Sequence, residues 1–177
     1  MNSPVSSDHL LTAQLKAAIR AAAAQLFANA ESYYYLSVST TEEGLAPVFS
    51  AWSWEALDAA ANAPDVRVEW LKWSYSDSPY FNVGESHFHA LQASWHARGS
   101  IDDFTDEEWN GELAVRLDVM EQALRELGEE GFFGRGEARN KIVIAAELVP
   151  PDRANTDRTI RLNPAEALTD WLREAAE

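Results

Sequence analysis

The 177-residue sequence has no cysteine, and it has only 14 Lys and Arg against 29 Asp and Glu. Without cysteine, disulfides, thiolate-held zinc or iron–sulfur sites and a cysteine nucleophile are excluded. The formal net charge of −15 argues against nucleic-acid binding, because phosphate neutralisation needs clustered basic residues. No apolar run is long enough to span a bilayer, and residues 1–8 do not have the pattern of a secretory signal. We therefore expect a cytoplasmic protein that contacts neither nucleic acid nor a membrane.

Aromatic residues, by contrast, are plentiful. Seven Trp, seven Phe and five Tyr argue against disorder, which goes with few aromatic residues. A chain of this length buries roughly 70% of its unfolded surface when it folds as one unit. We expect a single domain over residues 1–177.

The first half of the sequence predicts a helix followed by a hairpin. Residues 7–30 place apolar side chains on one helical face, and these are Leu11, Leu15, Ala18, Ile19, Ala22 and Leu26. Residues 33–40 and 45–54 are rich in aromatic and β-branched residues, and the short polar turn between them ends in Gly44. Ser53 is a suitable N-cap for a short helix over residues 54–62.

The second half predicts more helices and one clear strand. Residues 66–80 are expected to form a short helical or extended lead-in, a strand over residues 72–75 and then a turn. We expect one helix to begin at Ser86 and to end at Gly99. A second, long helix is expected to begin after Thr105, which starts a capping box, and its apolar stripe extends to Leu127. Residues 141–149 read as a buried strand, residues 159–162 as a short one and Asn163 as a helix start. The fold class predicted is α+β, a mainly antiparallel sheet covered by helices.

Motifs for catalysis or cofactor binding are not convincing. The glycine-rich loop of residues 131–136 lacks the Gly-Lys-Ser/Thr ending of a phosphate loop and has no strand directly before it. His87, His89 and His96 lack the i, i+4 spacing of a helical metal pair, and no Gly-x-Ser-x-Gly element is present. We predict no metal, no cofactor and no catalytic residues, and we leave open whether the protein has any enzymatic activity.

The acidic residues are unevenly distributed. Residues 102–130 contain eleven acids against only Arg116 and Arg125, which gives −9 of the total −15. The plain interpretation is a solvated face that keeps the protein soluble. The sharper one is a docking surface for a basic partner, since complementary charge speeds encounter and fixes orientation. The predicted contact residues are Asp102, Asp103, Asp106, Glu107, Glu108, Trp109 and Glu112.

Five aromatic residues lie within positions 70–81, and either the core or an exposed rim could hold them. If they border a pocket, the polar residues nearby make it a candidate site for a small ligand or substrate. The residues predicted for that pocket are Trp73, Asp77, Tyr80 and His87.

The stretch from Glu69 to Tyr80 (EWLKWSYSDSPY), together with the strands of residues 33–39 and 141–149, resembles a mostly bacterial family, domain of unknown function 4303. That family has no established activity, so the resemblance implies no residue roles. Small acidic proteins of this kind also look like immunity proteins of bacterial toxin systems. The leading hypothesis is a non-enzymatic module that binds a basic, toxin-like protein. The alternatives are the small enzyme or ligand-binding domain above and a homo-oligomeric structural protein.

Overall fold

The computed structural model describes residues 7–62 and 67–176, and its first element is the long helix α1 (Ser7–Phe27). Leu15, Ile19 and Ala22, which share one helical face, are fully buried. This face contributes to a core shared with the sheet, with α4 (His89–His96) and with α5 (Asp106–Glu129). The predicted N-terminal helix is confirmed, although it ends at Phe27.

Within the described residues, three strands form one sheet in the order β2-β1-β3. Strand β1 (Tyr33–Thr41) pairs antiparallel with β2 (Val48–Ser53), which confirms the predicted hairpin. Strand β3 (Val143–Val149) lies parallel to β1, with Ala146 opposite Val38. The expectation of a mainly antiparallel sheet is therefore wrong, and the sheet is mixed. The cause is the long helical excursion between β2 and β3, which returns the chain to the sheet in the direction of β1.

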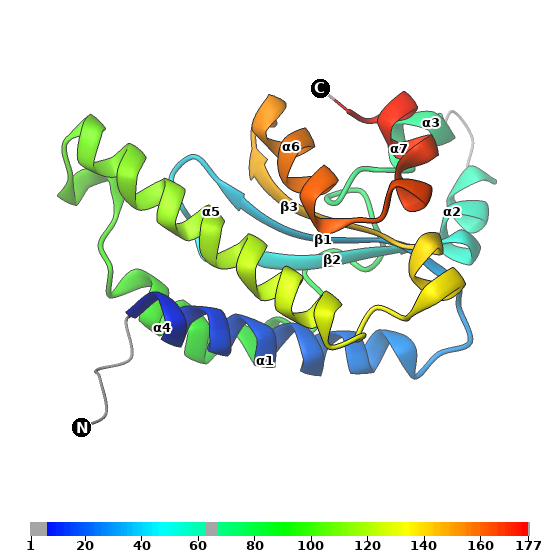
Figure 1. Ribbon diagram of the computed structural model, residues 1–177, viewed down its shortest axis with the longest axis horizontal. Helices are drawn as coiled ribbons and strands as arrows, with labels where there is room; N and C mark the ends of the chain where they lie inside the picture. Colours follow the sequence, from blue (N-terminus) through cyan, green and yellow to red (C-terminus); the bar gives the residue numbers. More distant parts are fainter. Residues whose placement is uncertain (1–6, 63–66, 177) are drawn as a thin grey trace.

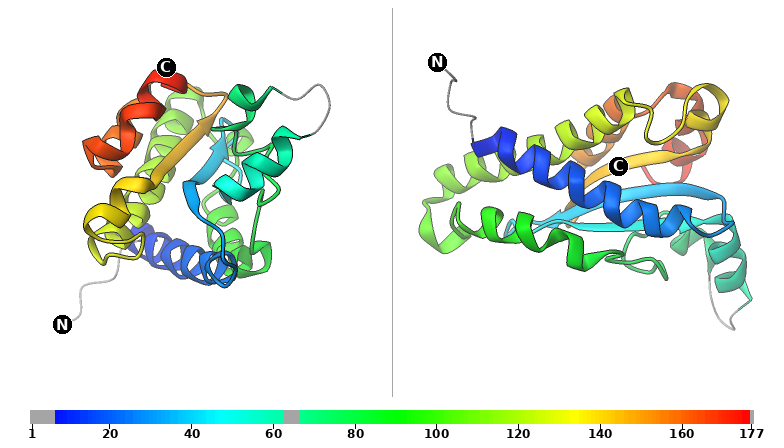
Figure 2. Two further views of the ribbon diagram at one scale, coloured as in Figure 1. Left: turned by 90° about the vertical axis from the view of Figure 1, so that its right-hand side faces the viewer. Right: turned by 90° about the horizontal axis from the view of Figure 1, so that it is seen from below.

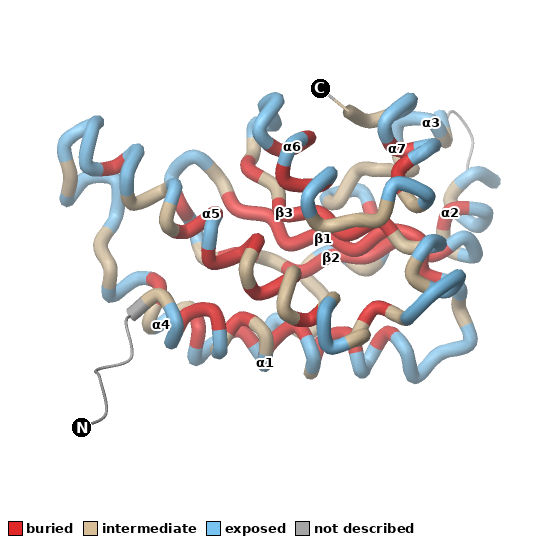
Figure 3. Tube along the Cα trace, viewed as in Figure 1, coloured by how far each residue is buried: buried red, intermediate tan, exposed pale blue. Residues whose placement is uncertain are grey.

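The two faces of the sheet differ in chemistry. One face carries apolar side chains such as Leu36, Val38 and Phe49 and packs on α1, α4 and α5. The other face carries a second apolar cluster, which includes Tyr35, Trp52 and Val143, and beside it Ser37, Ser39 and Glu147 form a polar strip. Figure 1 shows α1 and α4 on one side of the sheet and α6 and α7 on the other, and Figure 3 shows the buried strands between them. The remaining elements are α2 (Trp54–Ala61), α3 (Val68–Leu71), η1 (Glu85–Phe88), η2 (Ile101–Asp103), η3 (Gly136–Lys141), α6 (Arg153–Leu162), η4 (Ala165–Leu168) and α7 (Thr169–Glu174).

Local capping signals predicted two helix starts correctly. The Ser53 side chain accepts a hydrogen bond from the Ala56 amide at the start of α2. At the start of α5, Thr105 accepts from the Glu108 amide, and the Glu108 carboxylate accepts from the Thr105 amide. Helix α5 then buries its apolar stripe and runs the length of the sheet (Figures 1 and 2).

The short strand predicted for residues 159–162 is wrong, because these residues belong to α6. This helix lies along the free edge of β3, and its side chains satisfy the backbone there. The Asn155 side-chain amide bonds both the N–H and the C=O of Leu148, and Arg158 donates to the carbonyl of Ala146. Just after the helix, Asn163 bonds both backbone groups of Ile144. Side chains therefore cover an edge that would otherwise be open to pairing with another strand.

The strand predicted for residues 72–75 is also wrong. A helical lead-in is present as α3, and residues 72–75 that follow it form no strand. The Tyr34 hydroxyl donates to the carbonyl of Lys72 at 2.6 Å, and the Trp52 indole donates to the carbonyl of Ser74 at 2.6 Å. Side chains from the sheet thus hold this segment in an irregular path. Val66, where the predicted stretch begins, lies outside the described residues.

The described part of the chain has no helix that is both long enough and apolar enough to cross a membrane.

Candidate functional site

Most acidic residues of α5 and of the turn before it fall into two groups with different surroundings, and the exposed Asp118 and Glu129 belong to neither. Towards the middle and the end of the helix, cations neutralise the glutamates. We call this group the paired body, and its members are Glu112, Glu121, Glu126 and Glu130. At the start of the helix and in the turn before it lies a second group, which we call the acidic tip, and its members are Asp102, Asp103, Asp106, Glu107 and Glu108.

Glu121 illustrates the paired body. Its side chain is 6% exposed and receives Arg125 from α5 at 2.5 Å and Arg161 from α6 at 2.7 Å. The hydrogen bond from Arg161 is the largest influence on this carboxyl, and it lowers the pKa of Glu121 below its usual value. Its charge therefore holds α5 and α6 together.

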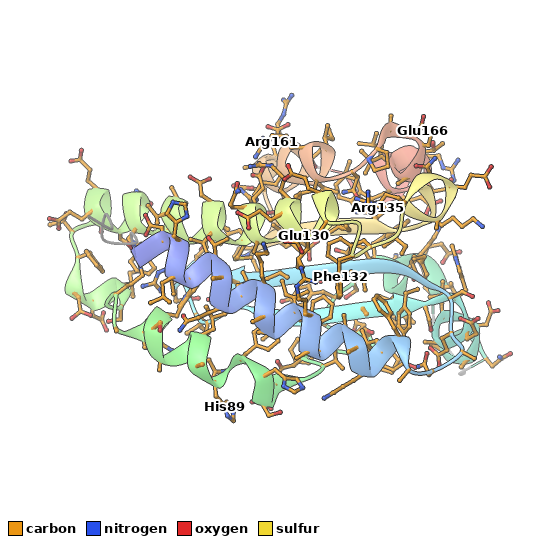
Figure 4. The ribbon with its side chains drawn as sticks, turned by 60° about the horizontal axis from the view of Figure 1, so that its bottom comes forward. His89, Glu130, Phe132, Arg135, Arg161 and Glu166 are labelled. Atoms are coloured by element: carbon orange, nitrogen blue, oxygen red, sulfur yellow. The ribbon has the colours of Figure 1, made fainter. Side chains whose placement is uncertain are left out.

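At the end of α5 the pairing is with α1. Lys16 bridges Glu126 at 2.6 Å and Glu130 at 2.8 Å, and Arg20 also pairs with Glu130. Figure 4 shows Glu130 where α5 faces α1. The hydrogen bond from Lys16 lowers the pKa of Glu126. These glutamates are already occupied by the protein's own cations.

The acidic tip is different. All five of its residues are exposed, and among residues 7–62 and 67–176 none of their carboxylates forms an ion pair. Asp103 accepts from the Ser100 amide at 2.7 Å, and Glu108 accepts from the Thr105 amide at 2.9 Å. These backbone hydrogen bonds lower the pKa of both carboxyls, so both stay charged at neutral pH. Five negative charges therefore lie within seven consecutive residues at one end of the molecule (Figure 1).

The two other residues predicted for this contact do not join the tip. Trp109 is 5% exposed, and its indole donates to the carbonyl of Glu42 at 2.9 Å. The Glu112 side chain is 9% exposed and pairs with Arg98 at 2.6 Å and Arg116 at 2.8 Å. Burial raises the pKa of Glu112, but the hydrogen bonds from the two arginines outweigh it, and the net shift is downwards. The hydrogen bond of Trp109 and the ion pairs of Glu112 hold this part of α5 against the rest of the fold.

Arg116 ties the tip to the rest of the fold, and the sequence analysis did not identify it. Its guanidinium is buried between the rings of Trp95 and Trp109, at 5.5 and 5.2 Å from their centroids. It donates to the carbonyl of Gly44 at 2.6 Å, in the hairpin turn, and to the carbonyl of Gly99 at 2.7 Å, just after α4. The sequence did contain one sign of this role, because Arg116 directly precedes Leu117, which lies on the apolar stripe of α5.

The four residues predicted for a pocket are not brought together. His87 lies in η1 beside α1, where its ring bonds the Gln25 side chain at 2.8 Å. Asp77 and Tyr80 border an open groove of about 530 Å³ next to α2. Trp73 instead lines a smaller cavity of about 230 Å³ on the face of the sheet that carries Glu147.

In the groove, the hydroxyl of Tyr80 donates to the carboxylate of Glu31 at 2.7 Å. Burial and this hydrogen bond together raise the pKa of Tyr80, so the phenol stays protonated and donates. The smaller cavity contains one carboxylate, Glu147, which accepts from the Tyr35 hydroxyl at 2.6 Å and from the Ser39 hydroxyl at 3.2 Å. The sequence analysis missed Glu147, although it is the only acid in the apolar run of residues 142–149.

Across the part of the chain that the structure describes, no three His, Cys, Asp or Glu side chains are grouped so that they could hold a metal ion. His87 and His89 are exposed, as is His96.

Comparison with known proteins places the chain in a family. Residues 15–164 match the family described as Domain of unknown function (DUF4303), and since this is most of the chain, the protein belongs to that family. No curated protein sequence and no solved structure shows significant similarity to it.

Proposed function

We propose that this member of the DUF4303 family is a non-enzymatic binding module whose acidic tip docks a basic protein partner. The observation that supports the proposal is the contrast along α5. The glutamates of the paired body are occupied by Lys16, Arg20, Arg98, Arg116, Arg125 and Arg161. Among the residues that the structure describes, the five carboxylates of the tip meet hydrogen-bond donors or solvent and no cation.

The tip has the physical properties that such a contact needs. Its five charges come from seven consecutive residues, so an approaching cation is attracted by their combined field. The tip is held firmly, because Arg116 fixes the start of α5 to the hairpin turn and to Gly99. A rigid charged surface loses little conformational entropy on binding and fixes the orientation of the partner.

The specific form of this proposal is an immunity protein that neutralises a basic toxin in the cytoplasm. The small size and the net charge of −15 are what motivate it, and the neighbouring genes test it. A toxin-like reading frame beside this gene would strengthen the proposal, whereas a metabolic operon would favour a ligand-binding role instead.

The binding proposal itself is tested with a charge-matched pair of variants. The tip variant carries Asp102→Asn, Asp106→Asn and Glu107→Gln, which leaves both capping carboxylates in place. The control variant carries Asp118→Asn, Glu129→Gln and Glu137→Gln, three exposed positions outside the tip. The two proteins have the same net charge and differ only in where it was removed.

Association of each variant with an oligolysine peptide is followed by stopped-flow fluorescence at low and at high salt. We expect the tip variant to associate about tenfold more slowly than the wild type at low salt, and this difference should shrink at high salt. The control variant should remain close to the wild type. Equal slowing of both variants would contradict the proposal, because net charge rather than the tip would then govern the encounter.

A further inference from the structure

The open groove next to α2 is lined by small and apolar side chains from separate parts of the chain. Helix α2 contributes Ala56, Ala59 and Ala60. The turn of residues 77–80 also lines the groove, and β2 contributes Trp52. The volume of about 530 Å³ lies within the range of roughly 300–1,000 Å³ that is typical of ligand sites.

Hydrogen bonds fix both parts of this lining to β2. The Ser53 hydroxyl, at the end of the strand, accepts from the Ala56 amide at 3.0 Å and so sets the start of α2. The Ser78 hydroxyl donates to the carbonyl of Ala51 and accepts from the Tyr80 amide at 3.0 Å. The groove is therefore preformed, and a ligand that enters it does not have to order its walls.

Three carboxylates border the groove, and they come from three separate segments. Glu31, just before β1, accepts from the hydroxyls of Ser53 and Tyr80. Within the described residues, Glu55 and Asp77 likewise meet neutral donors, and no cation pairs with any of the three acids. The groove therefore carries negative charge that the fold does not neutralise.

Two of these charges act on the same neighbourhood. Burial raises the pKa of Tyr33, and the charges of Glu31 and Glu55 add to this rise. The hydrogen bond from the Ser32 amide lowers the pKa of Glu55, so this carboxylate is charged at neutral pH. A cation in the groove is therefore attracted by more than one carboxylate at once.

An extended polycation fits this arrangement better than a metal ion does. In the described part of the chain, no three acidic, His or Cys side chains are grouped so that they could hold a metal, so the three carboxylates do not converge on one point. Spaced carboxylates beside apolar side chains match an aliphatic chain with several ammonium groups. Its methylene groups contact the apolar lining, and its ammonium groups face the acids. An anionic ligand would be repelled, and a neutral chain would gain only apolar contact.

We propose that this groove binds an aliphatic polyamine, with Glu31, Glu55 and Asp77 facing its ammonium groups and the alanines of α2 contacting its methylene chain. The groove shares no residue with the acidic tip. Figure 1 shows α2 and the start of α5 at opposite ends of the molecule. Polyamine binding in the groove and partner docking at the tip can therefore be tested separately, and either can fail without the other.

The ligand class is tested by isothermal titration of the full chain at physiological salt with spermidine, with octanediol and with magnesium chloride. Octanediol has an aliphatic chain without charge, and we expect it to bind at least about tenfold more weakly than spermidine. Magnesium has charge without a chain, and at equal concentration it should leave most of the spermidine bound.

The groove itself is tested with a substitution that changes no charge. Ala59→Leu fills the groove, and leucine is a good helix former, so α2 is retained. We expect this variant to bind spermidine at least about tenfold more weakly. Ala61→Leu, on the same helix but outside the lining, is the matched control and should bind as the wild type does.

A charge-matched pair of double variants tests the carboxylates. Glu55→Gln with Asp77→Asn should weaken spermidine binding about tenfold, and the new amide at position 55 can still accept from Ser32. Asp118→Asn with Glu137→Gln removes the same charge at exposed positions outside the groove, and it should change binding by less than about twofold.

Four outcomes would overturn this inference: spermidine does not bind, octanediol or magnesium matches it, Ala59→Leu binds as tightly as Ala61→Leu, or both charge variants weaken binding equally. If Ala59→Leu lacks the circular dichroism spectrum of the wild type, the charge-matched pair decides the question.

Discussion

The two ends of α5 carry the same kind of residue and use it differently. In the paired body, glutamates join α5 to α1 through Lys16 and to α6 through Arg161. In the tip, carboxylates cap η2 and α5 or face solvent without an ion pair among the described residues. The formal charge of a segment therefore overstates the charge available to a partner. Only the part that the fold leaves uncompensated can act at long range.

The largest expected effect concerns the arginine that separates the two regions. Arg116→Met leaves the carbonyl of Gly99 without the donor that Arg116 supplies and leaves the carbonyl of Gly44 with only the Trp95 indole. It also leaves Glu112 with Arg98 alone. Removing one partner of a buried ion pair is strongly destabilising, so we expect the free energy of unfolding to fall by about 3 kcal/mol. Urea denaturation followed by circular dichroism measures this loss. Arg125→Met, at a side chain that is 41% exposed, is the matched control and should cost under about 1 kcal/mol. Equal losses of unfolding free energy in the two variants would show that Arg116 contributes no more to stability than an exposed arginine does.

An intermediate effect is expected within the paired body. Glu121→Gln removes the negative charge that Arg125 and Arg161 share, and we expect a loss of about 1–2 kcal/mol in the free energy of unfolding at neutral pH. Because the pKa of Glu121 is lowered by folding, the wild type keeps this contribution above the unfolded value near 4.5 and loses it as the pH falls below that value. The difference between wild type and variant should therefore shrink between neutral pH and pH 3. A difference that stays constant with pH would contradict the pairing.

The structure also shows which elements can be predicted from local sequence patterns and which cannot. The face of α1 and the Thr105 capping box were predictable, because helical spacing and capping depend on residues close in the chain. Residues 72–75 were not, since their path depends on hydrogen bonds from Tyr34 and Trp52 in the sheet. Residues 159–162 were also predicted wrongly, because the contacts of α6 with the edge of β3, such as that of Arg158 with Ala146, are not visible in residues 159–162 themselves.

The candidate sites show the same difference between residues that are close in sequence and residues that are far apart. The five acids of the tip were predicted from their density in the sequence, and the fold places them together because they are neighbours. The pocket residues were chosen by proximity along the chain, and the fold separates His87 from Trp73. Glu147 and Tyr35, which meet in the cavity, are more than a hundred residues apart in sequence. No local pattern joins them.

The smallest effect on stability is expected at Thr105, which lies among the residues of the acidic tip and caps α5. Thr105→Ala removes the side chain that caps α5, and we expect a loss of about 1 kcal/mol in the free energy of unfolding. Thr105→Ser keeps the hydroxyl and should restore most of it. Thermal denaturation of the two variants makes the comparison. If the serine variant is as unstable as the alanine variant, the cap does not account for the effect.

The central claim is that the tip, and not the paired body, is the surface that meets a basic partner. The most direct test is a titration of isotope-labelled protein with an oligolysine peptide, followed by backbone amide chemical shifts. We predict that shifts concentrate on residues 100–109 and weaken as salt is added. Shifts that concentrate along residues 112–130, or that spread evenly over the acidic surface, would contradict the claim.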